Sequence, residues 1–155
     1  MKRRIFLKGS LATTTLMVAA SAGMLTPTRV LASAWPKAAF ESKTEAEALQ
    51  AFFGTSDVTQ SDQVSIKAPL QAENGAVVPI KVMTSLEDVE GIAICAIKNP
   101  RPYTTSLRVS GGGGGLYSTR IKMGQTSPVN SYVKAGGKLY MASQEIKVTV
   151  GGCGG

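Results

Sequence analysis

The sequence lacks histidine altogether and has only two cysteines among its 155 residues. Without histidine the chain cannot form a Ser-His-Asp or Cys-His catalytic site, and it loses the commonest ligand of zinc and copper. A metallochaperone would need more ligands than one cysteine and six methionines. We therefore expect neither a metal site nor a cofactor.

Acidic residues are absent from the first 34 residues, which hold five of the 17 basic ones. The rest of the chain has 12 basic residues against 10 acidic ones, so most of the net charge of +7 belongs to this first segment. A positive charge confined to one end is weak support for a nucleic-acid function. We expect no nucleic-acid partner.

The same first segment has no apolar run long enough to span a bilayer, because serine and threonine dilute the stretch from Gly9 to Leu25. Adjacent Arg3 and Arg4, followed by x-Phe-Leu-Lys, resemble a twin-arginine export signal. Ala32-Ser33-Ala34 is typical of a signal-peptide cleavage site. We expect residues 1–34 to be removed on export to the periplasm, which leaves no membrane anchor. The alternative is an uncleaved anchor.

Bulky side chains are also missing from the last five residues of the sequence, Gly151-Gly152-Cys153-Gly154-Gly155. Glycine has no Cβ and gives a thin, flexible backbone. The three residues from Val150 to Cys153 can reach roughly 10 Å. We expect residues 151–155 to be a flexible arm that offers the Cys153 thiol to the active sites of other proteins. The alternative is a tail in which the cysteine is incidental.

The arm has none of the neighbours that lower the pKa of a thiol. The nearest basic residue is Lys147, and no helix begins beside Cys153. A thiol with an ordinary pKa is only about 3% ionised at pH 7. Cys153 is therefore predicted to be a covalent attachment site on which partner enzymes act, and the protein is not expected to be an enzyme.

The other cysteine, Cys95, lies in the apolar run from Ile92 to Ile97, which is typical of a buried strand. A thiol in such a place is usually an inert, small apolar side chain. A disulfide between Cys95 and Cys153 is the alternative.

A short helix is predicted over residues 43–53. Ser42 and Thr44 each stand three residues before a glutamate, which is the pattern of a capping box. Apolar residues then recur at helical spacing as far as Phe53, and Gly54 ends the pattern.

From Gln63 onward, apolar residues alternate with polar ones at the period of a β-strand. The run Gly91–Lys98 is nearly all apolar, so it is the best candidate for a central strand. Pro79 suggests an edge strand, or a position at which its ring faces away from the neighbouring strand. The expected strands are residues 64–70, 78–82, 91–98, 103–110, 116–123, 131–135 and 139–150.

Three details of these strands carry further predictions. Asn74-Gly75 predicts a turn with positive φ, and the apolar face of the last strand changes parity between Ala142 and Glu145, which predicts a bulge or bend. Gly111–Gly115 is expected to be a flexible hairpin loop, because a phosphate-binding loop would need a helix after it. Val77–Met83, together with Phe52 and Phe53, is predicted to form a partner surface, and simple burial of these residues is the alternative.

The predicted fold is mainly β, an immunoglobulin-like antiparallel β-sandwich over residues 35–150 with a short N-terminal helix and a flexible C-terminal arm. The export signal, the sandwich, Ala72-Glu73-Asn74-Gly75, Ser118-Thr119-Arg120-Ile121 and the terminal stretch Glu145–Gly155 together resemble SoxY, the sulfur-carrier subunit of the periplasmic thiosulfate-oxidising Sox system. The Gly-Gly-Cys-Gly-Gly terminus is the most specific of these features.

The resemblance implies a function and a set of partners. A c-type cytochrome would join thiosulfate oxidatively to Cys153, a hydrolase would release sulfate, and a sulfur dehydrogenase would oxidise the remaining sulfur. The carrier would pair with SoxZ, a second small β-sandwich subunit. Two other functions stay open: a periplasmic thiol-transfer protein, for which the chain lacks a base and a second nearby cysteine, and a structural subunit of a redox complex.

Overall fold

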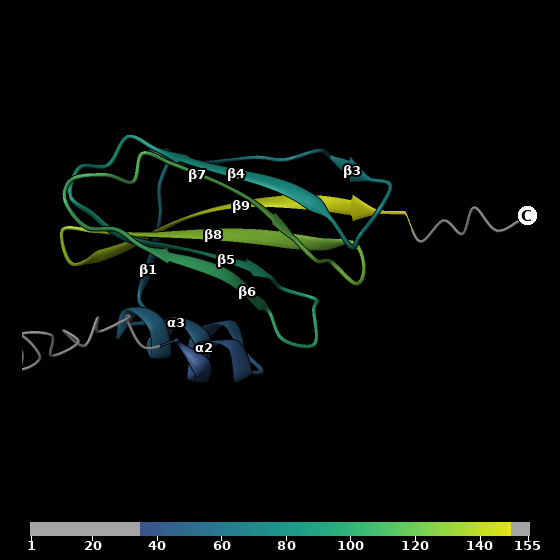
Figure 1. Ribbon diagram of the computed structural model, residues 1–155, viewed down its shortest axis with the longest axis horizontal. Helices are drawn as coiled ribbons and strands as arrows, with labels where there is room; N and C mark the ends of the chain where they lie inside the picture. Colours follow the sequence, from purple (N-terminus) through teal and green to yellow (C-terminus); the bar gives the residue numbers. More distant parts are fainter. Residues whose placement is uncertain (1–34, 150–155) are drawn as a thin grey trace, which may run out of the picture. The chain divides into compact units, whose positions relative to one another are not determined.

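The computed structural model describes residues 35–149 of the chain. Two β-sheets lie face to face, and two short helices cover the outer side of the larger one (Figure 1). The protein is therefore mainly β, as the sequence predicted. The elements are α2 (Lys37–Glu41), α3 (Glu45–Phe53), β1 (Val58–Gln60), β2 (Val64–Lys67), β3 (Gln71–Ala72), β4 (Val78–Thr84), β5 (Val89–Ala96), β6 (Tyr103–Arg108), β7 (Leu116–Ile121), β8 (Ser127–Ala135) and β9 (Lys138–Val148).

The larger sheet has the strand order β1-β9-β8-β5-β6, and the short strand β3 also pairs with β9. The smaller sheet has the order β2-β4-β7. The long strands pair antiparallel, as predicted, but β1 and β3 run parallel to β9. Strand β9 therefore has neighbouring strands on both of its edges, so the chain that follows it starts from a strand held on both sides.

The main core lies between the two sheets. In β4 every second residue, from Val78 through Ile80 to Val82, is buried, while the residues between them are exposed. This alternation is the period of a strand with one face on the core. Ile92, Ile94, Val129, Val133 and Ile146 of the larger sheet meet these side chains from the opposite side.

A second core lies between the larger sheet and the helices. Ala93 and Cys95 of β5 point to this side, where they meet Leu49 and Phe52 of helix α3 and Tyr132 of β8. Both faces of β5 are thus buried, which explains why its sequence is continuously apolar. The prediction that Gly91–Lys98 contains a central strand is confirmed, since β5 lies between β8 and β6.

Helix α3 forms where the sequence predicted it. Its N-terminus has the capping box, in which the Thr44 hydroxyl accepts from the Glu47 N–H, and Gly54 ends it in the left-handed conformation with φ of 77°. Three side chains fasten the N-terminal turn to β8. The Tyr132 hydroxyl and the Asn130 amide both donate to the Glu45 carboxylate, the latter at 2.8 Å.

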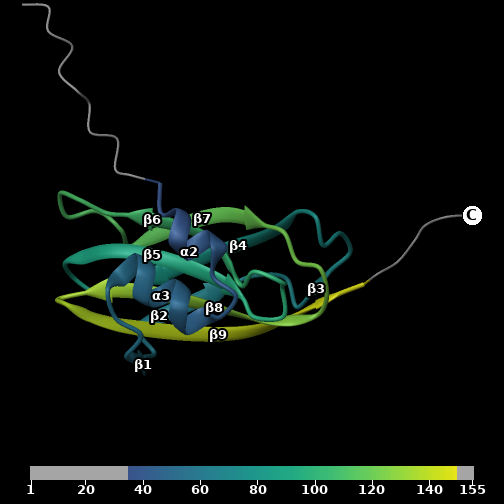
Figure 2. The same ribbon diagram turned by 90° about the horizontal axis from the view of Figure 1, so that it is seen from below.

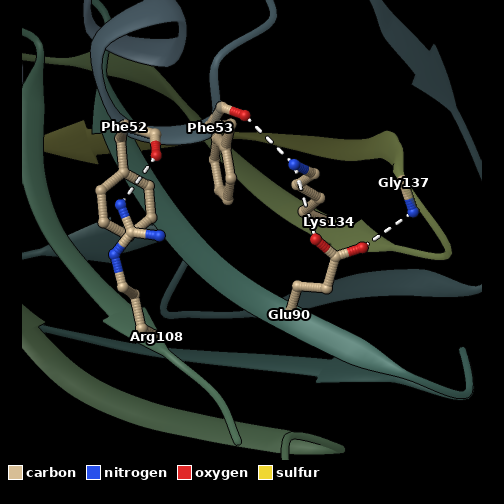
Figure 3. Close-up of polar contacts among 6 residues, drawn as sticks. All are labelled: Phe52, Phe53, Glu90, Arg108, Lys134 and Gly137. Carbon is tan, nitrogen blue, oxygen red and sulfur yellow. Dashed lines mark hydrogen bonds and ion pairs between the residues drawn. The ribbon is translucent and has the colours of Figure 1, made fainter.

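Two basic residues hold the other end of helix α3 against the sheet (Figure 3). The Arg108 guanidinium lies 4.6 Å from the centre of the Phe52 ring and donates to the Phe52 carbonyl at 3.1 Å. Lys134 donates to the Phe53 carbonyl at 3.2 Å and lies 3.5 Å from the Glu90 carboxylate. Cations beside the last carbonyls of a helix are favourable because the helix dipole is negative there.

The structure does not join Val77–Met83 with Phe52 and Phe53 into the one partner surface that the sequence predicted. Strand β4 is the middle strand of its sheet and not an edge, and both phenylalanines, which belong to helix α3, are buried against the other sheet. Pro79 is tolerated in this central strand because the pairing between β2 and β4 stops at Lys81. At Pro79 itself, only β7 pairs with β4.

The bulge predicted in the last strand is also wrong. Strand β9 pairs with β8 without interruption from Lys138 to Ile146. Its apolar pattern changes parity because the helices cover only part of its outer face. Leu139 and Met141 lie in the helix-side core, whereas Ile146 and Val148 face the core between the sheets.

The five glycines at 111–115 do not form a hairpin loop, because β6 and β7 belong to different sheets. The segment crosses from one sheet to the other. Three of its glycines, Gly111, Gly112 and Gly114, have positive φ. A Cβ on Gly114 would lie 2.9 Å from the Val89 side chain, so the crossing requires glycine there.

Candidate functional site at the end of strand β9

Cys153, the predicted attachment site, lies outside the described residues. So do its neighbours Gly151, Gly152, Gly154 and Gly155, and the export residues Arg3 and Arg4. What the structure describes is the strand that leads to Cys153. That strand, β9, ends at Val148, and Thr149 is the last described residue.

The end of β9 is hydrogen-bonded on both edges. On one edge the Val148 N–H donates to the Thr126 hydroxyl at 3.0 Å. On the other edge the Lys147 N–H donates to the Leu70 carbonyl at 2.9 Å, and the Thr149 N–H donates to the Ala72 carbonyl at 3.1 Å. The Thr149 hydroxyl donates to the same Ala72 carbonyl at 3.2 Å. The backbone is therefore fixed as far as Thr149.

A tight turn packs against this strand end. The Asn74 side chain accepts from the Ala76 N–H at 2.8 Å, and the Gly75 carbonyl accepts from the Met123 N–H at 2.7 Å. The positive φ predicted for Asn74-Gly75 is wrong, because neither residue has one. Glycine is required for space instead: a Cβ on Gly75 would lie 2.4 Å from the Met123 carbonyl oxygen and 2.9 Å from the Val148 side chain.

A cavity of about 560 Å³ opens beside the loop that follows β5. The Asn99 side chain shapes it by donating to the Lys122 carbonyl at 2.8 Å and accepting from the Gly124 N–H at 3.0 Å. The charged side chains of its lining, Arg101 and Lys122, are both basic. The lining contains no carboxylate or thiol, so its charged groups offer contacts to an anionic group.

Cys95 has no access to solvent. Its exposed fraction is 0%, and it lies among Tyr103, Tyr132 and the aromatic residues of helix α3 as a free thiol. Burial raises the pKa of the Cys95 thiol far above its ordinary value, and the Glu45 carboxylate raises it further. Cys95 therefore stays protonated and cannot react with a substrate, as the sequence predicted.

The described residues, 35–149, contain no group of three or more acidic, cysteine or histidine side chains that could hold a metal ion. Within the same range no helix is long and apolar enough to cross a membrane.

The anchors of β9 were not visible in the sequence. The sequence predicted a strand that begins at Ser131, whereas β8 begins at Ser127, directly after Thr126. Pro128 made the earlier start hard to predict, because proline is uncommon inside a strand. Strand β3, which supplies the Ala72 carbonyl, has only two residues and pairs with a strand far along the chain. Neither feature leaves a local periodic signal that would have revealed it.

Comparison with known proteins gives a single consistent family. The family described as sulfur oxidation protein SoxY matches residues 49–153, a stretch that ends at Cys153. The solved structure of the sulfur carrier protein SoxY from Chlorobium limicola f thiosulfatophilum is 39% identical with a TM-score of 0.60, and the alignment covers 67% of this chain and 94% of that one.

A superoxide reductase (neelaredoxin) from Ignicoccus hospitalis is 15% identical with a TM-score of 0.49, over 56% of this chain and 80% of that one. A likeness at that level carries no argument about function. The sequence matches no curated protein.

The packing at Gly75 yields a first prediction. Replacing it, as Gly75→Ala, should lower the free energy of unfolding by about 2 kcal/mol, because the new methyl group overlaps the Met123 carbonyl and the Val148 side chain. Urea denaturation measures the loss, and amide hydrogen exchange at Val148 and Thr149 should accelerate. In the control, Gly113→Ala, the new Cβ meets nothing nearer than 3.8 Å. Equal stability of the two variants would contradict the account.

The burial of Cys95 yields a prediction about pH. The folded chain keeps this thiol protonated, whereas the unfolded chain releases the proton above the ordinary thiol pKa of 9.0, so stability falls as the pH rises through that value. Between about pH 8 and about pH 10, Cys95→Ala should remove about 1 kcal/mol of that fall.

Urea denaturation with a reductant present at both pH values measures this difference. The variant loses stability at every pH through its cavity, so only the pH dependence is compared. Tyr103 and Tyr132, whose pKa values are also raised chiefly by burial, leave a residual fall in both proteins. Identical pH dependence in both proteins would show that Cys95 ionises in the folded state.

Proposed function

Since this chain belongs to the SoxY family of sulfur oxidation proteins, we propose that it carries thiosulfate-derived sulfur compounds covalently on Cys153. The observation that supports this most directly is that the family match extends to Cys153. The other cysteine is sealed in a core, so Cys153 is the thiol left to react.

A folded domain followed by a short segment that bears the thiol suits a carrier. The backbone is hydrogen-bonded on both edges as far as Thr149, and Cys153 follows four residues later. Four residues can extend at most about 14 Å. A thiol at that distance from a fixed strand end, flanked by glycines, can enter a narrow active site while the folded domain stays outside.

Loading is an oxidation. The Cys153 thiol loses its proton, its sulfur forms a bond to the outer sulfur of thiosulfate, and two electrons leave to the haem groups of a c-type cytochrome partner. The product is a cysteine S-thiosulfonate. The residues around Cys153 in the sequence include no base, so the partner has to supply the base and the electron acceptor.

Release of sulfate is a hydrolysis with no net electron transfer. Water attacks the terminal sulfonate sulfur, the bond between the two sulfur atoms of thiosulfate breaks, and sulfate leaves with the water oxygen. A persulfide stays on Cys153. A hydrolase performs this step, and a sulfur dehydrogenase oxidises the remaining sulfur where the organism has one. In each step the carrier supplies the substrate and the partner supplies the catalysis.

The carrier proposal predicts that Cys153 alone acquires sulfur. After incubation with thiosulfate and the partner enzymes, intact mass spectrometry should find adducts on the wild type and on Cys95→Ala, and none on Cys153→Ser. Thiosulfate oxidation should fall to background with Cys153→Ser and persist with Cys95→Ala. Unchanged oxidation with Cys153→Ser would favour a structural subunit, in which the thiol has no part.

Export and assembly form one further part of the proposal. Arg3-Arg4 would direct the chain through the twin-arginine route to the periplasm, already folded with a SoxZ-like subunit that has no signal of its own. Replacing the pair by Lys-Lys should leave both subunits together in the cytoplasm, as cell fractionation and co-purification measure. Normal export of that variant would rule out the twin-arginine route, and a monodisperse monomer would rule out the partner.

A further inference from the structure

Among residues 35–149, no helix or strand lies over the outer face of the smaller sheet (Figure 1). Helices α2 and α3 cover the outer face of the larger sheet (Figure 2). Side chains of β2, β4 and β7 alternate strictly between the core and this open face. The outward residues are all exposed: Ser65, Lys67, Pro79, Lys81, Met83, Leu116, Ser118 and Arg120. We call the part formed by Lys67, Lys81 and Arg120 the basic face.

The basic face contains an unfavourable pair. Lys67 and Lys81 are direct partners in the antiparallel ladder between β2 and β4, so their Cβ atoms lie about 5 Å apart on the same side. Like charges directly opposite each other in a sheet are destabilising. None of the outward residues of this sheet is acidic, and the ion pairs of residues 35–149 involve other lysines, Lys37 and Lys134.

The surface between these cations is hollowed. A cavity of about 330 Å³ is lined by Lys67, Lys81 and Ser118 together with Ala68, Pro69, Pro79 and Ile80. Met83 and Leu116, which are direct partners in the next ladder, extend the face with apolar surface that is 37% and 58% exposed. Exposed apolar side chains rimmed by polar residues are typical of a protein interface, and the two lysines give this one a positive charge.

The basic face lies toward the end of the sandwich at which strand β9 ends. Strand β4 begins and β7 ends where Gly75 bonds to Met123, and Gly75 packs on Val148 of β9. Arg120 and Pro79, which pair with each other, are near that end of their strands. A protein seated on the basic face would therefore be close to the base of the Cys153 segment.

We propose that the basic face is the docking surface for an acidic patch beside the active site of the enzyme that loads Cys153. This inference rests on the proposed function and adds the chemistry of the partner surface. An acidic partner would place carboxylates between Lys67 and Lys81, which removes their repulsion and fills the hollow. A second copy of this chain would do the reverse, because a two-fold contact through this face brings cations against cations.

The first test separates docking from folding. Replacing one lysine, as Lys81→Glu, converts the like-charge pair into an opposite-charge pair, so the melting temperature should rise by about 1–3 °C. The same change should slow the loading of Cys153. A variant that is more stable and yet loads more slowly cannot owe the defect to unfolding.

The second test uses two double variants of equal charge. The first, Lys67→Glu with Lys81→Glu, reverses the basic face, and the control, Lys43→Glu with Lys138→Glu, reverses two exposed lysines elsewhere. The probe is the source organism's purified thiosulfate-loading cytochrome, with thiosulfate. Intact mass gives the second-order rate constant for loading at about 20 mM and about 300 mM salt, where charge attraction is strong and screened respectively.

We expect the basic-face variant to load about tenfold more slowly at low salt, with little salt dependence, while the control stays close to the wild type. Equal rates for the two double variants would overturn the docking surface and leave the carrier function intact. No adduct on the wild type would overturn the carrier function itself. A wild-type dimer that only the basic-face variant dissociates would assign the face to a second copy and also overturn the proposal.

Discussion

The structure depends on strand β9 having hydrogen-bonded neighbours on both edges up to its last described residue. A strand at the end of a chain usually frays, because few contacts hold it. Here β8 runs along one edge, while β1 and β3 pair parallel with the other. The hydroxyl of Thr126 and the carbonyls of Leu70 and Ala72 complete the ladder. The segment bearing Cys153 therefore begins from a fixed point.

The two cysteines have very different surroundings along the chain. Cys95 is enclosed between β5 and helix α3, and burial holds its pKa high enough to keep it protonated. No such enclosure is encoded around Cys153, whose neighbours in the sequence are glycines. A carrier needs this separation, because an oxidised cargo on one thiol would otherwise exchange with the other.

The mainly β fold, helix α3 and the central strand could be predicted because each depends on a local pattern: a capping box with apolar residues at helical spacing, and a continuous apolar run. The errors came from contacts between distant elements. The parity change in β9 reflects where helix cover ends, and Gly75 is set by its close approach to Met123 and not by φ. Of the candidate site, Cys153 stays a prediction from the sequence, and the anchors at Thr126 and Ala72 could not be predicted because they depend on pairing between distant segments.

The central claim is that sulfur compounds travel on Cys153. The most direct measurement is the mass of the C-terminal peptide from protein isolated from its native source during growth on thiosulfate, without reductant. We predict a mixture of the free thiol, persulfide and thiosulfonate forms on the peptide that contains Cys153, with the peptide that contains Cys95 unmodified. A single disulfide joining Cys95 to Cys153, or an unmodified Cys153 throughout growth, would contradict the account.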